Sequence, residues 1–552
     1  MHIGMIQLNP TVGDVTTNTN NIIEAVLKMD ADLILTPEMS ICGYPPRDLL
    51  YCAGFIQACE EAVQRIAQAC SEQTILVGHP RQDYGTGKIR NSVSVLHNGE
   101  VLAVADKQLL PSYDVFDEKR YFEPGEKFCM FELFGEKIGI AICEDFWRGF
   151  DSSSAPTYEY NPVRQLLDAG CSVLVSPSAS PFVTSKHQSH LEYALDVANE
   201  HSITIAVCNQ VGGNDDLVFN GGSFVVSSAG VLGTLPLFEV GATSVSLQGD
   251  AVDVVNEYCN DEERCRAIIL GIKDYFCKTG HSKALLGLSG GIDSALVATL
   301  AVVALGKDAV TGVLMPSRYS SIGSVEDAEQ LAANLGIATV TLPIEHMHAA
   351  FEQTLRDSCQ ESTGLAEENA QARIRGLLLM ALSNQQGSLL LATGNKSELA
   401  VGYSTLYGDM SGAISVIGDI YKTDVWSMSN LLNHTHSLFG FSSAPIPESS
   451  ITKPPTAELR PNQLDQDSLP SYDELDAVLR LHIDLDLGVD EIEEELDGTT
   501  EFISNIIRMV DIAQFKRDQA AVIFKTSPRT FGRGRRMPIV MKRNWATSRE
   551  TT

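Results

Sequence analysis

Residues 288–294 place two glycines, two serines and one aspartate between two apolar runs. The first run, 284–288, has the length of a buried parallel strand, and the second, 295–306, is alanine-rich and has the length of a helix. A strand, a glycine turn and a helix start direct backbone N–H groups and the helix dipole at an anion. No lysine follows the glycines, so this is not the Walker A pattern. The stretch predicts a phosphate-binding loop, with an ordinary strand-to-helix turn as the alternative.

A second set of chemically capable residues lies in the first half. Glu38, Lys107 and Cys143 each follow an apolar run, and sites in α/β folds gather at the ends of strands. Together they form an acyl-transfer set: the carboxylate takes the thiol proton, and the lysine lowers the thiol pKa and stabilises an oxyanion. Taken singly, the cysteine could be a packing residue and the two charged residues could be solvated surface groups.

Strand-like apolar runs and helical segments alternate along the chain as far as about residue 241, and these elements must position the three residues. Strand-like runs occupy 3–8, 33–36, 74–77, 93–96, 101–105, 137–142, 173–176, 203–208 and 222–226, and helices are expected near 18–28 and 53–73. This alternation predicts a layered α/β domain.

The second half continues the pattern after the glycine turn. Strands are expected at 309–315, 338–342 and 389–392, and helices at 324–335 and, before the turn, near 262–278. Such a pattern is typical of a doubly wound α/β domain with a parallel sheet, whose sites lie at the carboxyl ends of the strands. An acidic segment separates the halves, so we predict domains at 1–245 and 263–552 with a linker at 246–262.

Composition limits the functional classes. The chain has 552 residues, 44% of them hydrophobic, and a formal net charge of −31, which argues against a nucleic-acid or anionic-membrane surface. The first residues read as a strand and not as a signal peptide, and the longest apolar run is too short for a bilayer. The twelve cysteines include no CxxC pair, which favours reduced thiols and argues against a zinc site. We expect a cytoplasmic enzyme.

Strings around the three acyl-transfer residues resemble the nitrilase superfamily of amidases. They are 36–40 with 43–46, then 106–111, and then 143–147. The resemblance implies an αββα sandwich with Glu38 as general base, Cys143 as nucleophile and Lys107 as stabiliser of the tetrahedral intermediate.

The same family pattern implies a glutamine pocket. It places Tyr113, Ser180 and Lys186 around bound glutamine. Glu118 matches a second glutamate that helps to position substrate in related amidases. The alternative for Glu118 is a surface ion pair with its neighbour Lys119 or Arg120.

The second half carries a different resemblance. The string Ser-Gly-Gly-x-Asp-Ser at 289–294 is similar to the signature of the ATP pyrophosphatases, whose loop grips the β- and γ-phosphates. Strings at 315–319, 368–375, 393–398, 402–409 and 455–459 resemble the NAD synthetases. With the amidase-like half in front, the chain as a whole resembles the glutamine-dependent NAD(+) synthetase family.

That resemblance implies three binding sets in the second half. The ATP set is Gly287, Leu288, Ser289, Gly290, Gly291, Ile292, Asp293, Ser294 and Thr393, with Lys422 nearby; the deamido-NAD set is Asn369, Glu398 and Lys516. Asp293 and Glu398 are hard oxygen ligands suited to Mg²⁺, and the role of Glu398 stays open between metal and dinucleotide. Leu406 departs from the family, because ammonia-dependent relatives often carry a lysine there.

The implied activity is the ATP-driven amidation of deamido-NAD⁺ to NAD⁺, the final step of NAD biosynthesis, with ammonia passed from the glutamine site to the adenylate site. The family also implies a homo-oligomer. Two rivals are another ATP pyrophosphatase of the GMP-synthetase type, and an inactive amidase half that serves as a scaffold while free ammonia is used. Intact Glu38, Lys107 and Cys143 argue against the scaffold.

Two C-terminal segments are informative by composition. Residues 442–472 are rich in proline, serine and aspartate, which is typical of a surface loop or linker, although the family folds this segment beside the synthetase site. Residues 529–536 are basic, and in so acidic a chain they favour a packed tail or a phosphate contact over RNA binding.

Overall fold

The computed structural model describes residues 1–150, 155–253, 258–358, 364–496 and 498–542. Contacts between residues divide the chain into two compact units, Met1–Cys259 and Asn260–Thr552. The division falls within the predicted linker 246–262, of which residues 254–257 lie outside the described residues. Helix α6 (Asn260–Thr279) opens the second unit.

The first unit contains two six-stranded sheets in which parallel and antiparallel pairs are mixed. The first sheet, in the order β14-β1-β2-β3-β4-β5, consists of β14 (Gly241–Ser246), β1 (His2–Gln7), β2 (Leu33–Leu35), β3 (Thr74–Asp83), β4 (Lys88–His97) and β5 (Glu100–Asp106). The second, β13-β12-β9-β8-β7-β6, consists of β13 (Gly230–Thr234), β12 (Phe224–Ser227), β9 (Thr204–Asn209), β8 (Val173–Ser178), β7 (Glu136–Ile140) and β6 (Cys129–Leu133).

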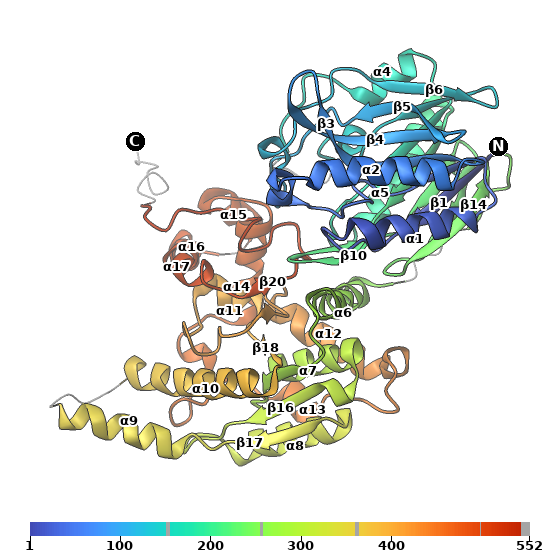
Figure 1. Ribbon diagram of the computed structural model, residues 1–552. Helices are drawn as coiled ribbons and strands as arrows, with labels where there is room; N and C mark the ends of the chain where they lie inside the picture. Colours follow the sequence, from blue (N-terminus) through green and yellow to red (C-terminus); the bar gives the residue numbers. More distant parts are fainter. Residues whose placement is uncertain (151–154, 254–257, 359–363, 497, 543–552) are drawn as a thin grey trace, which may run out of the picture. The chain divides into compact units, whose positions relative to one another are not determined.

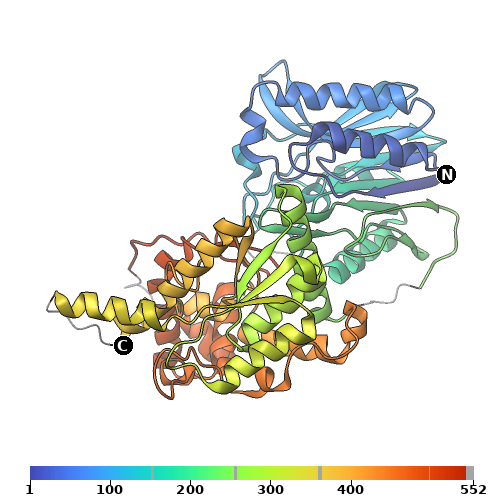
Figure 2. The same cartoon turned by 60° about the horizontal axis from the view of Figure 1, so that its bottom comes forward.

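Alternation along the strands explains how these sheets form layers. In β2, Leu33 and Leu35 pack with Ile140 and Val175 of the second sheet, whereas Ile34 packs in another cluster with helices α1 (Val15–Leu27) and α2 (Phe55–Ala69). Figure 2 shows these two blue helices on one outer face of the unit. Helix α5 (Lys186–His201) packs against the second sheet. The predicted αββα sandwich is confirmed.

The second unit is built on one six-stranded sheet in the order β17-β16-β15-β18-β19-β20, and all of its pairs are parallel. Its strands are β15 (Ala284–Gly287), β16 (Val310–Leu314), β17 (Ala338–Thr341), β18 (Leu389–Ala392), β19 (Ile414–Ser415) and β20 (Val522–Ile523). The strand order reverses between β15 and β18, and ligands of open α/β sheets bind at such a switch point. The predicted parallel sheet is confirmed.

Helices flank this sheet, as Figure 1 shows. They include α7 (Ile292–Leu305), α8 (Ile322–Leu335), α10 (Leu365–Gln386) and α12 (Lys422–His434). Helix α9 (Glu345–Asp357) lies beside α10. Helix α10 packs through Leu378 and Leu382 on strand residues Leu285, Val313 and Leu390. Helix α7, most of whose residues are buried, follows the glycine turn directly, so its N-terminus faces the strand ends.

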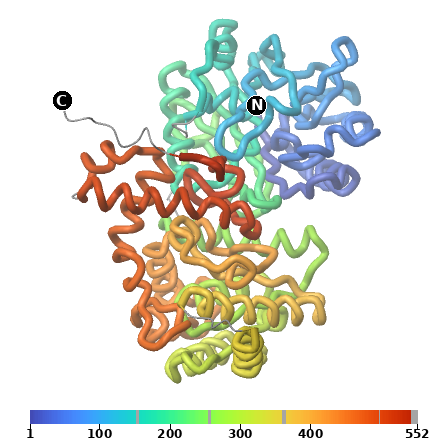
Figure 3. Tube along the Cα trace, turned by 90° about the vertical axis from the view of Figure 1, so that its left-hand side faces the viewer, coloured from blue at the N-terminus to red at the C-terminus, as the bar shows by residue number. Residues whose placement is uncertain are grey.

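A second helical layer completes this unit, in the orange and red part of the tube in Figure 3. It contains α11 (Lys396–Val401), α14 (Tyr472–Leu479), α15 (Val489–Glu495), α16 (Thr500–Ile512) and α17 (Gln514–Arg517). Leu475, Ile492 and Ile503 share one core cluster there. In the basic segment 529–536, Phe531 and Arg535 are buried, whereas Arg533 and Arg536 are exposed, so the segment is packed in part. No described helix is long and apolar enough to cross a membrane.

Residues 442–472 differ from the loop or linker that their composition predicts. They include helix α13 (Glu448–Thr452), and Ile446, Ser450 and Leu469 are buried. The Ser450 hydroxyl donates to the Gly290 carbonyl at 3.1 Å, which ties this segment to the glycine turn. The composition of residues 442–472 indicates a loop because the segment is rich in proline, serine and aspartate. A few buried residues and the Ser450 hydrogen bond nevertheless hold it in place.

Candidate active sites

A buried ammonium group bridges two carboxylates in the first unit. Lys107 follows β5, and its Nζ lies 2.8 Å from Oε1 of Glu38 and 2.8 Å from Oε1 of Glu118. All three side chains are buried. Burial disfavours the charged form of the lysine, but the two carboxylates outweigh it and raise the Lys107 pKa well above its usual range. Lys107 therefore stays cationic although its side chain is buried.

Two residues that the sequence did not indicate complete this network. Tyr44 donates its hydroxyl to Oε1 of Glu118 at 2.8 Å, and Asn91 donates its amide to Oε1 of Glu38 at 2.6 Å. Tyr44 lies in the predicted string 43–46 without a role of its own, and Asn91 lies on β4, which carried no motif. Charge-assisted hydrogen bonds of this kind fix the carboxylates in one orientation.

The surface ion pair considered for Glu118 is wrong. A short 3₁₀ turn, Glu118–Arg120, turns the glutamate inward toward Lys107 and Tyr44. Burial raises the Glu118 pKa to about 7, against the opposing effect of Lys107. The side chain is thus part of the Lys107 network and is not a solvated charge.

Cys143 stands at a strained point between β7 and helix α3 (Glu144–Trp147). Its φ is +47°, in the left-handed region that side chains rarely adopt, and its thiol is buried. Burial, followed by the Glu38 carboxylate, raises the thiol pKa well above its usual range, and Lys107 lowers it by a smaller amount. The predicted lowering by the lysine exists but does not prevail, so the thiol is protonated until a base removes its proton.

Asp145 holds the two loops of this site together. Its carboxylate accepts from the backbone N–H groups of Gln108 (3.0 Å), Leu109 (2.7 Å) and Ile142 (3.2 Å). These donors flank Lys107 on one side and Cys143 on the other. Burial raises the Asp145 pKa to about 7. A residue in the predicted string 143–147 therefore has a positioning role that the sequence did not single out.

The predicted glutamine-binding residues do not all meet. Ser180 and Lys186 line one small cavity of about 20 Å³ together with Trp147, whose ring stacks on His190 at 3.7 Å. Tyr113 is not among the residues that line it. Its hydroxyl instead donates to Oε2 of Glu144 at 3.0 Å, on the residue next to Cys143.

The glycine turn of the second unit has the geometry of an anion cradle. Gly290 has φ +78°, and a Cβ added there would collide with the Ser324 backbone carbonyl, so only glycine fits. The Gly291 N–H donates to Ser289 Oγ at 3.1 Å, and Ser294 Oγ lies 3.1 Å from that same hydroxyl. Because α7 begins at once, its N–H groups and dipole also face this space.

Two carboxylates and a lysine lie beside the turn. Lys422 pairs with Oδ2 of Asp293 and lies 3.6 Å from Oε1 of Glu398, and Asn395 donates to Oδ1 of Asp293 at 2.9 Å. Burial, and then the Asp293 charge, raise the Glu398 pKa to about 8. The side chains of Asp293 and Glu398 are partly buried, 19% and 18% exposed, and their mutual repulsion favours positive charge beside them.

Two cavities open at the carboxyl ends of β15 and β18. The first, about 210 Å³, is lined on one side by predicted residues and on the other by the segment 453–458 with Asp465. The predicted residues around it are Ser289, Gly291, Ile292, Asp293, Ser294, Thr393, Glu398 and Lys422. The second, about 280 Å³, is lined by Gly287, Leu288, Ser289 and Thr393 and by apolar side chains that include Met315 and Leu379. Gly290 lines neither cavity, because its backbone faces Ser324 and Ser450.

The other predicted dinucleotide residues, Asn369 and Lys516, bond to the segment 402–405. Lys516 donates to the carbonyl oxygens of Gly402 (2.7 Å) and Ser404 (2.6 Å), and Asn369 accepts from the Thr405 hydroxyl at 2.8 Å. Ser404 lines the first cavity, whereas Asn369 and Lys516 line neither cavity. Both therefore hold the segment 402–405 in the present structure, and their contact with a dinucleotide stays a prediction.

Comparison with known proteins connects the two sites. The family model described as carbon-nitrogen hydrolase matches residues 2–248, and the model described as NAD synthase matches residues 264–520. A glutamine-dependent NAD(+) synthetase of Synechocystis sp. is 44% identical over 97% of this chain and 98% of its own length. The enzyme of that name from Thermotoga maritima is 39% identical, over 98% of each chain. The chain belongs to the glutamine-dependent NAD(+) synthetase family.

Solved structures agree with this assignment. The glutamine-dependent NAD⁺ synthetase of Acinetobacter baumannii in complex with ADP has a TM-score of 0.75 at 36% identity over 98% of each chain. The synthetase of Cytophaga hutchinsonii has a TM-score of 0.81 at 21% identity, which supports the fold alone. As a member of the glutamine-dependent NAD(+) synthetase family, the chain is an amide-forming ligase.

Proposed function

We propose that this chain amidates deamido-NAD⁺ to NAD⁺ with ATP, which leaves as AMP and pyrophosphate, and with nitrogen taken from glutamine at Cys143. The observation that carries the proposal is the buried Lys107 ammonium between Glu38 and Glu118, together with the effect of the Glu38 and Lys107 charges on the pKa of the Cys143 thiol. Burying Glu38, Lys107 and Glu118 together costs desolvation free energy, and an inactive scaffold would have no use for that arrangement.

In the glutaminase step, Glu38 takes the proton from the Cys143 thiol, and the thiolate attacks the carboxamide carbon of glutamine. The negative oxygen that forms is stabilised by the Lys107 ammonium. Glu38 then passes its proton to the departing nitrogen, ammonia leaves, and water hydrolyses the thioester to glutamate. Glu118 fixes Lys107, and its buried Oε2, which has no hydrogen-bond partner among the described residues, accepts from the substrate amide.

In the synthetase step, the carboxylate of deamido-NAD⁺ attacks the α-phosphate of ATP, and pyrophosphate departs. The backbone N–H groups and hydroxyls of Ser289–Ser294 bind the pyrophosphate at the start of α7. The apolar cavity lined by Met315 and Leu379 suits an adenine ring. Ammonia then attacks the adenylate carbon and displaces AMP.

The residues of the first cavity fit Mg²⁺. Asp293 and Glu398 supply carboxylate oxygens, and burial and then the Asp293 charge raise the pKa of Glu398; a divalent cation would relieve the repulsion between the two carboxylates. Mg²⁺ commonly uses one or two protein carboxylates and completes its shell with water and phosphate oxygens. When bound there, it would neutralise charge that develops on the phosphates. Lys422 supplies a fixed positive charge beside it.

Three further proposals rest on the chemistry of the intermediate and on the family. Ammonia released into water at neutral pH is mostly protonated and no longer nucleophilic, so we propose that it passes between the sites without mixing with bulk solvent. We also propose a homo-oligomer, because symmetric assembly is common among soluble enzymes, and a cytoplasmic location. Light scattering of the purified chain tests the oligomer, and a monomer at micromolar concentration would contradict it.

The activity itself is tested by NAD⁺ formation from ATP and deamido-NAD⁺ with either glutamine or ammonium as donor. The proposal requires product with both donors. Product with ammonium alone would identify the scaffold alternative, and product with neither donor would refute the reaction.

A further inference from the structure

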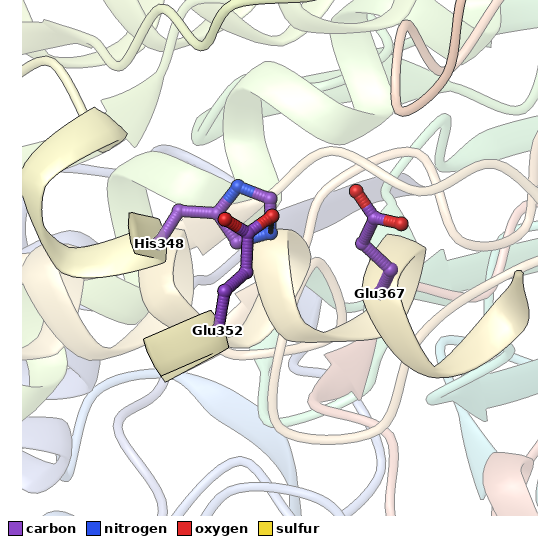
Figure 4. Close-up of side chains that lie close together, drawn as sticks. All are labelled: His348, Glu352 and Glu367. Atoms are coloured by element: carbon purple, nitrogen blue, oxygen red, sulfur yellow. Dashed lines mark ion pairs between the residues drawn. The ribbon is translucent and has the colours of Figure 1, made fainter. Parts of the chain in front are cut away.

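A histidine and two glutamates converge outside both described cavities of the second unit. His348 and Glu352 are one turn apart on α9, and Glu367 lies in the first turn of α10. One ligand atom from each lies within 4.8 Å of the others. Figure 4 shows the imidazole and the two carboxylates turned toward a common space between the helices.

His348 is the informative member of this group. Its side chain is fully buried, yet neither ring nitrogen has a hydrogen-bond partner among the described residues. The His348 Nε2 atom lies 3.8 Å from Oε1 of Glu352, which is too long for a hydrogen bond. Buried polar groups in proteins almost always have partners, so an imidazole without one requires an explanation. A buried imidazole without a hydrogen-bond partner, beside two carboxylates, has the surroundings of a metal ligand.

The two carboxylates are already oriented by neighbours, as metal ligands usually are. Arg318 donates to both oxygens of Glu352 at 3.3 Å, and the Tyr319 hydroxyl donates to Oε1 of Glu367 at 3.0 Å. These donors are consecutive residues of one loop. Each carboxylate oxygen has a second lone pair, so these hydrogen bonds are compatible with a bound cation.

We propose that His348, Glu352 and Glu367 form a binding site for a divalent transition metal, with Zn²⁺ as the best-suited ion. Imidazole nitrogen with two carboxylates is a ligand set that Zn²⁺ accepts, and three protein ligands with a water in the fourth position make an open site. Mg²⁺ and Ca²⁺ favour oxygen ligands alone. A neutral imidazole and two carboxylates carry the charge that balances a divalent ion.

The site would join three parts of the synthetase unit. It links α9 to α10 and, through Arg318 and Tyr319, to the loop after β16. Residues of that loop and of α10, Pro316, Ser320 and Arg375, line the apolar cavity. An ion at this position therefore steadies one wall of that cavity, at a distance from the Asp293 and Glu398 carboxylates, and its loss should be detectable in stability as well as in substrate binding.

The test uses the full chain, stripped of metal and then dialysed against buffered Zn²⁺, with bound metal measured by elemental analysis. Glu352→Gln and Glu367→Gln keep side-chain size and should each weaken Zn²⁺ binding by at least about 10- to 100-fold, the loss that outer partners alone cause. The matched control is Glu345→Gln. Glu345 accepts from the same Arg318 at 2.7 and 3.1 Å but is not one of the clustered ligands. It should bind Zn²⁺ like the wild type.

A second measurement separates this site from the twelve cysteines. Co²⁺ bound by imidazole and carboxylates gives d–d absorption without a thiolate charge-transfer band, and the Glu352→Gln variant should lose that absorption. Zn²⁺ should also raise the melting temperature of the wild type and of Glu345→Gln, but not of the two ligand variants. Equal Zn²⁺ binding by all variants, a thiolate band that accounts for the bound Co²⁺, or no binding by the wild type would overturn the proposal.

Discussion

Replacing Glu118 by glutamine tests whether the second carboxylate at Lys107 serves the glutaminase reaction. The substitution keeps the shape and one acceptor oxygen, so Tyr44 and Lys107 can still donate to it. What is lost is one of the two negative charges that hold the buried ammonium. Lys107 is then held by the charge of Glu38 alone and is drawn toward the general base, away from the oxyanion that it should stabilise.

The expected size of the effect follows from the hydrogen bond that is weakened. A hydrogen bond to a charged group is worth about 1.5–3 kcal/mol. If that energy is lost from the transition state, kcat for glutamate release falls by about 10- to 150-fold. Because the carboxylate that is removed also has a pKa raised to about 7 by burial, its neutral replacement should cost little stability.

The assay compares glutamate release with ammonium-dependent NAD⁺ formation in the same preparation. Glu118→Gln should lose the first activity and keep the second. Glu123→Gln is the matched control, since Glu123 is half exposed and only approaches Lys88, at 3.7 Å. Unchanged glutamate release in Glu118→Gln, or an equal fall of both activities, would refute the role assigned to Glu118.

Three further predictions follow from the two sites. Cys143→Ala should abolish glutamine-dependent synthesis and leave ammonium-dependent synthesis within about twofold, measured with each donor in turn; equal loss with both donors would contradict the division of labour. Asp293→Ala should lower the rate of NAD⁺ synthesis by at least about 100-fold with either donor, since a bound metal ion stabilises the charge of the transition state by several kcal/mol. Retention of most activity with ammonium would refute the proposed role of residues 289–294 in phosphate binding. The Glu398 carboxyl has a pKa of about 8 in the folded chain and an ordinary carboxyl pKa in the unfolded chain. Because the folded chain binds this proton more tightly, protonation of Glu398 adds to the free energy of unfolding at low pH, and this stabilisation is lost as the pH rises through about 8. Without Mg²⁺, the melting temperature of Glu398→Gln should therefore fall less between about pH 5 and about pH 9 than that of the wild type, and parallel pH profiles would contradict the raised pKa.

Sequence patterns predicted the elements that bury a continuous apolar run. The runs that became β2, β8, β15 and β18 appear as strands close to their expected bounds. Strands β6, β13 and β14 were not predicted, because they lie at or near sheet edges, are partly exposed and carry polar residues. Their pairing depends on neighbouring strands and not on their own composition.

The contacts inside each site were predicted in part. Glu38, Lys107 and Cys143 could be grouped because each ends a strand, and the structure brings Glu38 and Lys107 into contact. Tyr44 and Asn91 could not be placed, because their partners depend on how a turn and a neighbouring strand fold over the site.

Two contacts in the second unit could not be predicted from the sequence, because they join residues that are far apart along the chain. Lys422 was expected near ATP, but its ion pair with Asp293 spans more of the chain than any local pattern covers. The spacing of His348 and Glu352 was visible as one helical turn, whereas Glu367 joins them only through the packing of α9 against α10.

The central claim is that nitrogen travels from glutamine, through chemistry at Cys143, to the carboxamide of NAD⁺. The most direct measurement supplies the wild-type chain with ATP, deamido-NAD⁺, glutamine labelled with ¹⁵N in its amide, and an excess of unlabelled ammonium. Mass spectrometry of the product should show NAD⁺ that carries ¹⁵N in an amount close to that of the glutamate released. Released glutamate without ¹⁵N in the NAD⁺ would contradict the claim, because the two half-reactions would then share a chain without sharing the nitrogen.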